Sequence, residues 1–379
     1  MSKNAVYHPV NWMDGMKINK SHFVDEENAF TYQVSESIKA RINEHNYGLL
    51  PSWNEKDGLN ISVDVENSNS VYIKINSCKA ITFGGYIINI NENDNNSIAT
   101  SASYSNSGGS NDSIYYLILS VNPYKRVPAG EVNPEEEPLR YPYTTSEYKI
   151  HLVPSEELGP QPLLNHLILG KINVHNGQAK LADNFIPSSI SLQSHSALLD
   201  AHRTLSNMLG RLEINTIGII QKVVQKDQQH KLAQIVKYIS ENILVYLNTT
   251  LYRFRKLLSG EAPIALIDSI AVLAKTLKNT LDTRQGCGKE ELLNYFAEWC
   301  DLNQGKFETL MSEVIALDYN HMDMRDSIDQ CLKFVKEIDI LFQKLNELDY
   351  IGRKSDQGMI VKEEIRVEQH KKTKNFFGI

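Results

Sequence analysis

The sequence predicts a multidomain α+β fold in which an antiparallel β-sandwich precedes an α-helical bundle. Its 379 residues are enough for two or three domains at about 150 residues each. Up to about residue 190, short runs alternate apolar and polar residues, which is typical of strands with one face in a core. After Pro187 the apolar residues recur at helical spacing instead. Because no helical pattern separates the strands from one another, an antiparallel sandwich is favoured over a parallel sheet.

One helix is expected ahead of the strands, over residues 21–46. Its apolar residues recur every fourth position and would form a single stripe: Phe30, Val34, Ile38 and Ile42. The acidic run Asp25–Glu27 would lie near the start of this helix, where the helix dipole favours negative charge.

The expected strands cover residues 59–65, 71–75, 81–90, 114–121, 148–153, 167–174 and 178–181. Gly84 and Gly85 indicate a hairpin turn or a bulge in the third of these runs. Residues 91–113 are rich in Asn, Ser and Gly, so we expect an exposed loop there. Residues 123–142 contain NPEEEP and several further prolines, which predicts a long connection between strands, either a binding loop or a solvated excursion.

A seven-residue spacing marks the first helix of the bundle. The residues concerned are Leu198, Leu205, Leu212 and Ile219. Such a spacing keeps one seam of apolar side chains facing a partner helix. Further helices are expected over residues 235–258, 261–283, 290–317 and 326–348, with Pro263 in the first turn of the second of them.

Composition excludes several classes of protein. The 39 basic and 46 acidic residues give a net charge of −7, which does not suit a protein that binds duplex nucleic acid. Four cysteines without paired spacing indicate a reducing compartment. The N-terminal residues lack the apolar run of a signal peptide, and no run of 18 apolar residues occurs, so we expect a cytoplasmic protein.

Motifs for chemistry are weak throughout the chain. The run Gly286–Glu290 lacks the first glycine and the Ser or Thr of a phosphate-binding loop. The run Asp318–Asp326 holds three carboxylates and His321, but it lacks the glycine and the final glutamate of a calcium loop. Hydrolase and zinc motifs are missing. We therefore expect no catalytic residue, no cofactor and no metal.

The opening of the chain carries a resemblance to a known family. The run Val10-Asn-Trp-Met-Asp-Gly-Met, followed by His22-Phe23, resembles the opening of TssK, the baseplate adaptor subunit of type VI secretion systems. In that family a tryptophan, a Gly-Met pair and a His-Phe pair lead into a helix. Weaker matches follow in the same order along the chain: Tyr47-Gly48-Leu49, Gly84-Gly85, residues 115–151, residues 167–174 and Tyr319-Asn320-His321.

The resemblance implies a homotrimer with a sandwich similar to the shoulder of phage receptor-binding proteins and a helical neck. It implies that the N-terminal region binds baseplate wedge proteins like TssF and TssG, through Trp12, Met13, Gly15, Met16, His22 and Phe23. Aromatic and Met side chains of this kind are typical of interface hot spots. The alternative is that they pack on the chain's own sandwich. In this trimer the seam would be formed by the four residues that are spaced by seven.

The expected organisation is therefore a docking segment (1–24), a sandwich with its leading helix (25–188), a neck (189–350) and a short basic tail (351–379). Family members have a folded head after the neck that joins the membrane complex, whereas about 30 residues follow Leu348 here. Residues 352–379 hold seven basic and four acidic residues, and Phe376 and Phe377 are candidates for docking to a membrane-complex protein or another anchor. The resemblance places such a protein at a baseplate docked to the inner membrane.

Two other functions remain open at this stage. The first is a phage-tail-like sandwich that recognises a receptor or a carbohydrate through a surface platform of aromatic residues. The second is a hydrolase built on the sandwich, which would need a pair of acid and base side chains that the sequence does not display.

Overall fold

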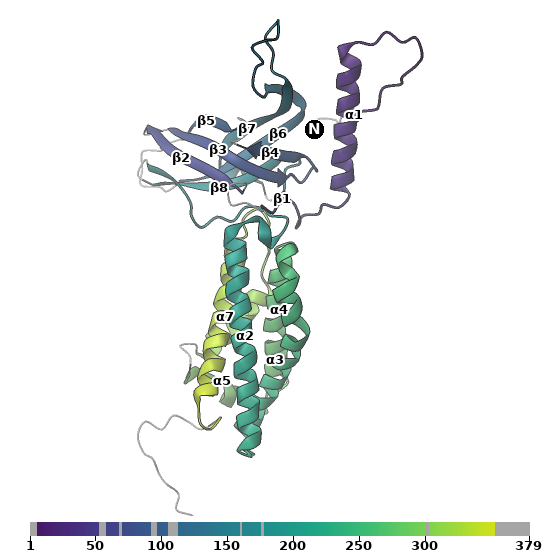
Figure 1. Ribbon diagram of the computed structural model, residues 1–379. Helices are drawn as coiled ribbons and strands as arrows, with labels where there is room; N and C mark the ends of the chain where they lie inside the picture. Colours follow the sequence, from purple (N-terminus) through teal and green to yellow (C-terminus); the bar gives the residue numbers. More distant parts are fainter. Residues whose placement is uncertain are drawn as a thin grey trace, which may run out of the picture.

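The computed structural model describes residues 6–52, 58–67, 70–91, 97–104, 113–159, 161–175, 178–299 and 303–352. A β-sandwich lies at one end of an elongated helical bundle, and helix α1 (Lys20–Lys39) stands beside the sandwich (Figure 1). The two parts have separate hydrophobic cores, one formed by residues 47–181 and one by residues 186–351. The predicted fold class, a sandwich followed by a bundle, is confirmed.

The sandwich consists of two antiparallel sheets. In the first, β3 (Ser70–Ile81) is central and pairs with the other four strands: β1 (Gly48–Leu49), β2 (Asn60–Asn67), β4 (Ile87–Asn91) and β5 (Ile98–Ser103). The second has the order β7 (Tyr143–Pro154), β6 (Ser113–Ala129), β8 (His166–His175) and β9 (Gln178–Leu181). Apolar residues of both sheets share one core, because alternate side chains of each strand point inward.

Two loop predictions in this region are wrong. Residues 98–103, expected within an exposed loop, form β5 and pair with β3 from Ser70 to Ile75. The residues of β5 alternate between half-buried and exposed positions, but most of their side chains are small or polar, so the sequence shows no alternation of apolar and polar residues. Backbone hydrogen bonds to the partner strand stabilise β5 instead. Strand β6 continues to Ala129, so only residues 130–142 connect it to β7.

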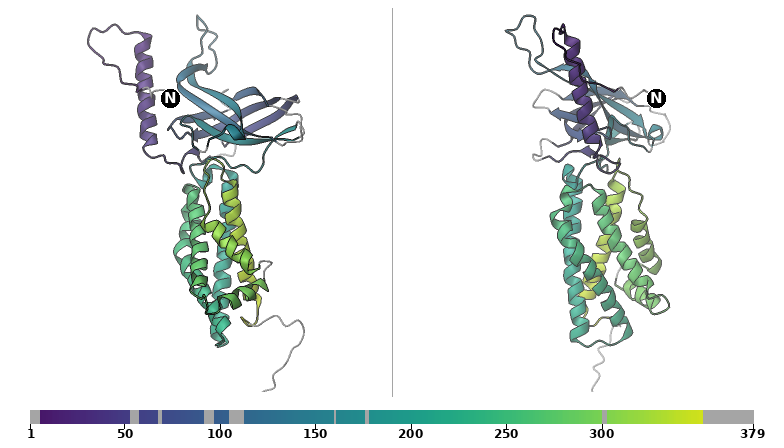
Figure 2. Two further views of the ribbon diagram at one scale, coloured as in Figure 1. Left: turned by 180° about the vertical axis from the view of Figure 1, so that it is seen from behind. Right: turned by 90° about the vertical axis from the view of Figure 1, so that its right-hand side faces the viewer.

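The neck contains α2 (Ser196–Gln225), α3 (Lys231–Lys256), α4 (Ile264–Asp282), α5 (Lys289–Ala297), α6 (Gln304–Ile315) and α7 (Arg325–Glu347). Figure 2 shows the long helices running side by side along the neck. The single helix expected over residues 290–317 is wrong, since α5 and α6 are separate helices there. Among the described residues, none of the helices is both long and apolar enough to cross a membrane.

The predicted seam residues lie inside the neck of a single chain. Leu198, Leu205, Leu212 and Ile219 each have an exposed fraction of 0% and belong to the bundle core. They face α3 and α7, the neighbours of α2, rather than a surface that a second copy could reach. The prediction of an intermolecular seam at these four residues is therefore wrong. A seven-residue spacing indicates that a neighbouring helix packs on this face, and here the neighbouring helices belong to the same chain.

The sandwich and the neck are joined by backbone and side-chain contacts around β1. The amide of Leu49 donates to the carbonyl of Ser188 at 2.8 Å, and the amide of Ile190 donates to the carbonyl of Leu49 at 3.0 Å. From the loop before α7, His321 reaches the carbonyl of Tyr47 at 2.8 Å. These contacts hold the sandwich on the end of the bundle.

Candidate partner-docking site

Residues 6–19 fold back along α1 and form, together with its first turns, a hook (residues 6–24). Tyr7 lies near Tyr32, with ring centroids 6.4 Å apart, and the amide of Val10 donates to Glu26 at 2.8 Å. The chain segment thus runs antiparallel to the helix over three turns (Figure 1). The acidic residues expected to favour the helix start lie further along α1, because the helix begins at Lys20, and Glu26 instead holds the hook.

Two local features turn the hook into the helix. Gly15 has φ of +77°, and the amide of Met16 donates to the carbonyl of Met13, which closes a tight turn. A left-handed residue of this kind favours glycine. Asn19 then caps α1 by accepting from the amides of Ser21 and His22, while His22 accepts from the amide of Asn19. This is a capping box in which a histidine takes the place of the usual glutamate.

The hook exposes most of its apolar side chains. The exposed fractions are 45% for Trp12, 68% for Met13 and 60% for Phe23, and Ile18 is exposed as well. The Trp12 ring lies 6.0 Å from the ring of His22 and 6.1 Å from that of Phe23, so these three side chains form one cluster. The structure thus brings together Trp12, His22 and Phe23, with Met13, Gly15 and Met16 in the turn between them. Exposed clusters of apolar side chains mark interaction sites.

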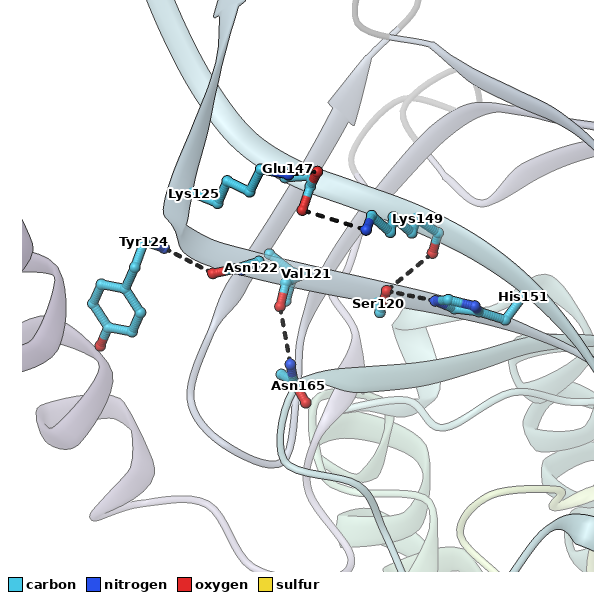
Figure 3. A network of polar contacts seen from close by, with 9 residues as sticks. All are labelled: Ser120, Val121, Asn122, Tyr124, Lys125, Glu147, Lys149, His151 and Asn165. Atoms are coloured by element: carbon cyan, nitrogen blue, oxygen red, sulfur yellow. Dashed lines mark hydrogen bonds and ion pairs between the residues drawn. The ribbon is translucent and has the colours of Figure 1, made fainter. Parts of the chain in front are cut away.

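A cluster of tyrosines fastens the hook to the sandwich. Strand β6 has a bulge at residues 123–125, because Asn122 pairs with Glu147 whereas Arg126 pairs with Ser146. Figure 3 shows that Tyr124 leaves the sheet at this bulge and points toward α1. Its ring stacks on that of Tyr7 at 4.2 Å, and burial next to Tyr86 raises the pKa of Tyr124.

Ion pairs hold the same region. Arg126 pairs with Glu27 of α1 at 2.5 Å, which ties β6 directly to the helix. On the neighbouring strand Glu147 pairs with Lys125 at 2.6 Å, and this contact lowers the pKa of Glu147. The hook is therefore presented by a fixed support rather than by a loose end.

Helix α1 carries three residues of the predicted apolar stripe, Phe30, Val34 and Ile38, whereas Ile42 lies beyond the end of the helix at Lys39 and packs against the core of the sandwich. Only Asn28, Ala29 and Ser35 of the helix are buried, and Phe30 is 66% exposed. The stripe lines an open groove of about 750 Å³ between α1, the sandwich and the top of the neck. Its apolar walls are formed by Phe30, Val34, Ile38, Ile42, Ile81 and Ile190.

Two polar side chains on the sandwich lie close enough to suggest a nucleophile and a base. On the outer face of β6 and β7, Ser120 Oγ lies 3.0 Å from Nε2 of His151 and also donates to the carbonyl of Lys149 (Figure 3). A nucleophile and base pair needs a third group that orients the base. Among the described residues, no carboxylate is hydrogen-bonded to His151. No group of three or more metal-ligating side chains occurs in the described ranges.

The two runs that superficially suggested ligand binding have structural roles. Lys289, after the glycines of residues 286–288, forms ion pairs of 2.7 Å with both Asp282 and Glu308, which raise its pKa. His321 is buried and accepts from the Tyr319 hydroxyl at 2.7 Å. Phe376 and Phe377, the candidates for tail docking, lie outside the described residues.

Comparison with known proteins addresses the fold. No protein-family model matches the sequence, and no curated protein is significantly similar to it. A crystal structure of TssK is similar over 88% of this chain and 69% of that chain, with 13% identity and a TM-score of 0.51. The chain has the TssK fold. A chain of the TssK-TssF-TssG baseplate subcomplex of a type VI secretion system, seen by cryo-electron microscopy, matches with 13% identity and a TM-score of 0.50. This match covers 88% of this chain and 99% of that one.

The TssK fold confirms the expectation drawn from the opening motif, at the level of architecture. Sequence reasoning identified the exposed side chains of the hook but missed its support. The bulge at Tyr124 and the pairing of Glu27 with Arg126 join residues about a hundred positions apart. In the sequence, the one sign of this support was Tyr124, which lies between Pro123 and two basic residues. A tyrosine in such a run does not by itself indicate a contact with a distant helix.

Proposed function

We propose that this chain is a structural subunit of a type VI secretion baseplate and acts without catalysis. In this role it is a homotrimeric adaptor between wedge proteins like TssF and TssG and the complex that anchors the baseplate at the inner membrane. The observation that carries the proposal is the exposed cluster of Trp12, Met13 and Phe23, presented on a fixed support by a chain with the TssK fold. One structure with this fold is a subcomplex with TssF and TssG.

The docking step follows from the chemistry of the hook. Trp and Phe side chains contribute the largest apolar area per residue, and burying each in a partner's pocket is worth about 1.5–3 kcal/mol. Their conformation is already set by the capping box and by the contact of Val10 with Glu26. Binding therefore costs little additional ordering, which favours affinity.

The trimer is proposed to use surfaces other than the predicted seam. The stripe of α1 and its groove leave a continuous apolar wall that no other element of the described chain covers. On α2 the exposed apolar side chains are Ile214, Ile217 and Val224, whose spacing of three and seven places them on one face. A second and a third copy would cover these surfaces, since exposed apolar area of this extent is unusual in a monomer.

The experiment is co-purification of the full chain with a TssF–TssG complex. Trp12→Ala with Phe23→Ala should abolish binding and leave the trimer intact, because the two side chains lie outside the proposed trimer surfaces. Val65→Ala with Tyr72→Ala, two exposed apolar positions on the sandwich, is the matched control and should bind normally. Retained binding by the hook variant would refute the docking role.

A further inference from the structure

The hairpin between β6 and β7 continues beyond the sandwich as an arm (residues 126–146). Its two strands remain paired from Arg126 with Ser146 to Ala129 with Tyr143, and residues 130–142 form the tip. The tip and the hook both lie at the end of the molecule opposite the neck (Figures 1 and 2). A partner that approaches this end could therefore meet both.

The tip and the first residue of β7 together expose three large side chains in a short stretch. The exposed fractions are 67% for Leu139, 52% for Tyr141 and 71% for Tyr143. Tyr143 lies across Gly130, where a Cβ atom would come within 2.9 Å of the tyrosine ring. Tyrosine is enriched in interface hot spots because it combines a large apolar surface with a polar end.

The same stretch is strongly acidic. Residues 130–142 contain four glutamates and one arginine, a net charge of −3. Arg140 pairs with Glu136 at 2.7 Å, and within the described part of the chain it is the only ion-pair partner of these glutamates. Glu131, Glu135 and Glu137 are exposed. Three uncompensated charges at the end of a protruding hairpin favour a partner of opposite charge.

The arm is held firmly where it leaves the sandwich. Arg126 is fixed by Glu27 of α1, and Lys125 by Glu147 of the opposite strand. Inside the tip, the side chain of Asn133 accepts from the amide of Glu135 at 3.1 Å, which forms a local turn. A hairpin anchored at its base delivers its tip with little loss of conformational entropy.

We propose that the tip of the arm is a second docking element for the wedge protein that the hook binds. It fits an apolar cleft bordered by Lys and Arg side chains: Tyr141 and Tyr143 enter the cleft, and the three glutamates face its basic border. This inference rests on the proposed function. It adds a second binding surface on this chain and the charge of the site that the partner must present to it.

The test measures association and dissociation of a TssF–TssG complex on the immobilised full chain by biolayer interferometry, at low and high salt. The charge variant is Glu131→Gln with Glu135→Gln and Glu137→Gln. Its matched control, Glu156→Gln with Glu157→Gln and Glu298→Gln, changes the net charge equally at exposed positions outside the arm. The apolar variant is Tyr141→Ser with Tyr143→Ser. Circular dichroism checks that all variants are folded.

The charge variant should slow association about tenfold at about 50 mM salt and much less at about 300 mM, where such charges are screened. The control should associate like the wild type. The apolar variant should speed dissociation about tenfold or more. Rate constants within about twofold of the wild type in both arm variants would overturn the inference and leave the proposed function standing. A wild-type chain that does not bind TssF–TssG would overturn both.

Discussion

Protonation of His321 should weaken the junction between sandwich and neck. The ring is 4% exposed, and its two nitrogens are both used in the neutral form. Nδ1 accepts from the Tyr319 hydroxyl at 2.7 Å, and Nε2–H donates to the carbonyl of Tyr47 at 2.8 Å. Burial, together with nearby His45, lowers the pKa of His321 from 6.5 to about 4. Protonation of Nδ1 would end the hydrogen bond that the Tyr319 hydroxyl donates to it, and among the described residues no carboxylate forms an ion pair with the ring.

The sign and size of the effect follow from this lowered pKa. Below pH 6.5 the unfolded chain binds a proton at His321, whereas the folded chain does not until the pH approaches about 4. The free energy of unfolding contributed by this group is therefore fully present above pH 6.5 and declines as the pH falls toward about 4. One pH unit corresponds to about 1.4 kcal/mol, so the total loss is about 3 kcal/mol.

The assay is urea unfolding followed by far-ultraviolet circular dichroism at about pH 7.5 and about pH 4.5. Other groups also titrate in this range, including His166 and His195, whose pKa values are lowered by burial. The comparison is therefore between the wild type and His321→Gln, with His8→Gln, an exposed histidine of the hook, as the control. The wild type and the control should lose about 2–3 kcal/mol more than His321→Gln between the two pH values. Equal losses in all three proteins would refute the reasoning.

Two further predictions concern packing. Leu205→Ala should lower the free energy of unfolding by about 3 kcal/mol, independently of protein concentration, because the side chain is buried in the neck of its own chain. Ile214 lies on the same helix and is 67% exposed, so Ile214→Ala should change the free energy of unfolding by less than about 0.5 kcal/mol. If the proposed trimer uses this face, Ile214→Ala should also lower the fraction of trimer measured by sedimentation or light scattering. The opposite pattern would restore the seam predicted from the seven-residue spacing. Gly48→Ala should lower the stability of the junction by about 3 kcal/mol in thermal or urea unfolding, since Gly48 has φ of +113° and an added Cβ would clash with the Ser188 carbonyl. The control Gly159→Ala should be nearly neutral, because no other atom lies near the position of its Cβ. Similar stabilities of these two variants would contradict the close approach of Gly48 to Ser188.

The predicted stripes and strands show what local pattern can report. Alternation identified β2, β3 and β8, because a strand with one buried face must place apolar residues at every second position. It failed for β5, whose Ala, Thr and Ser side chains contribute little burial and whose stability comes from pairing with β3. On α1, Phe30, Val34 and Ile38 were placed correctly on one face, but the predicted helix continued past its actual end at Lys39. The sequence did not predict the open groove that this face lines.

The candidate site also has a part that the sequence could predict and a part that it could not. Trp12, Met13 and Phe23 could be predicted as candidates for docking because a short segment of aromatic and Met residues has a specific chemical character. The exposure of these side chains depends on where the chain folds back, and on the contacts of Tyr124 and Arg126 with residues far away in sequence. No local pattern encodes those contacts.

Taken alone, the amino-acid sequence determined the order of architecture, strands and then helices, because the period of apolar residues follows directly from backbone geometry. Tertiary structure alone decided which surfaces remain open. Leu205 and Ile214 are both apolar residues of α2, yet one is buried and the other exposed, since α3 and α7 cover only one side of that helix. Periodicity states that a face will be buried, and only the packed chain shows whether its own elements or another copy must cover it.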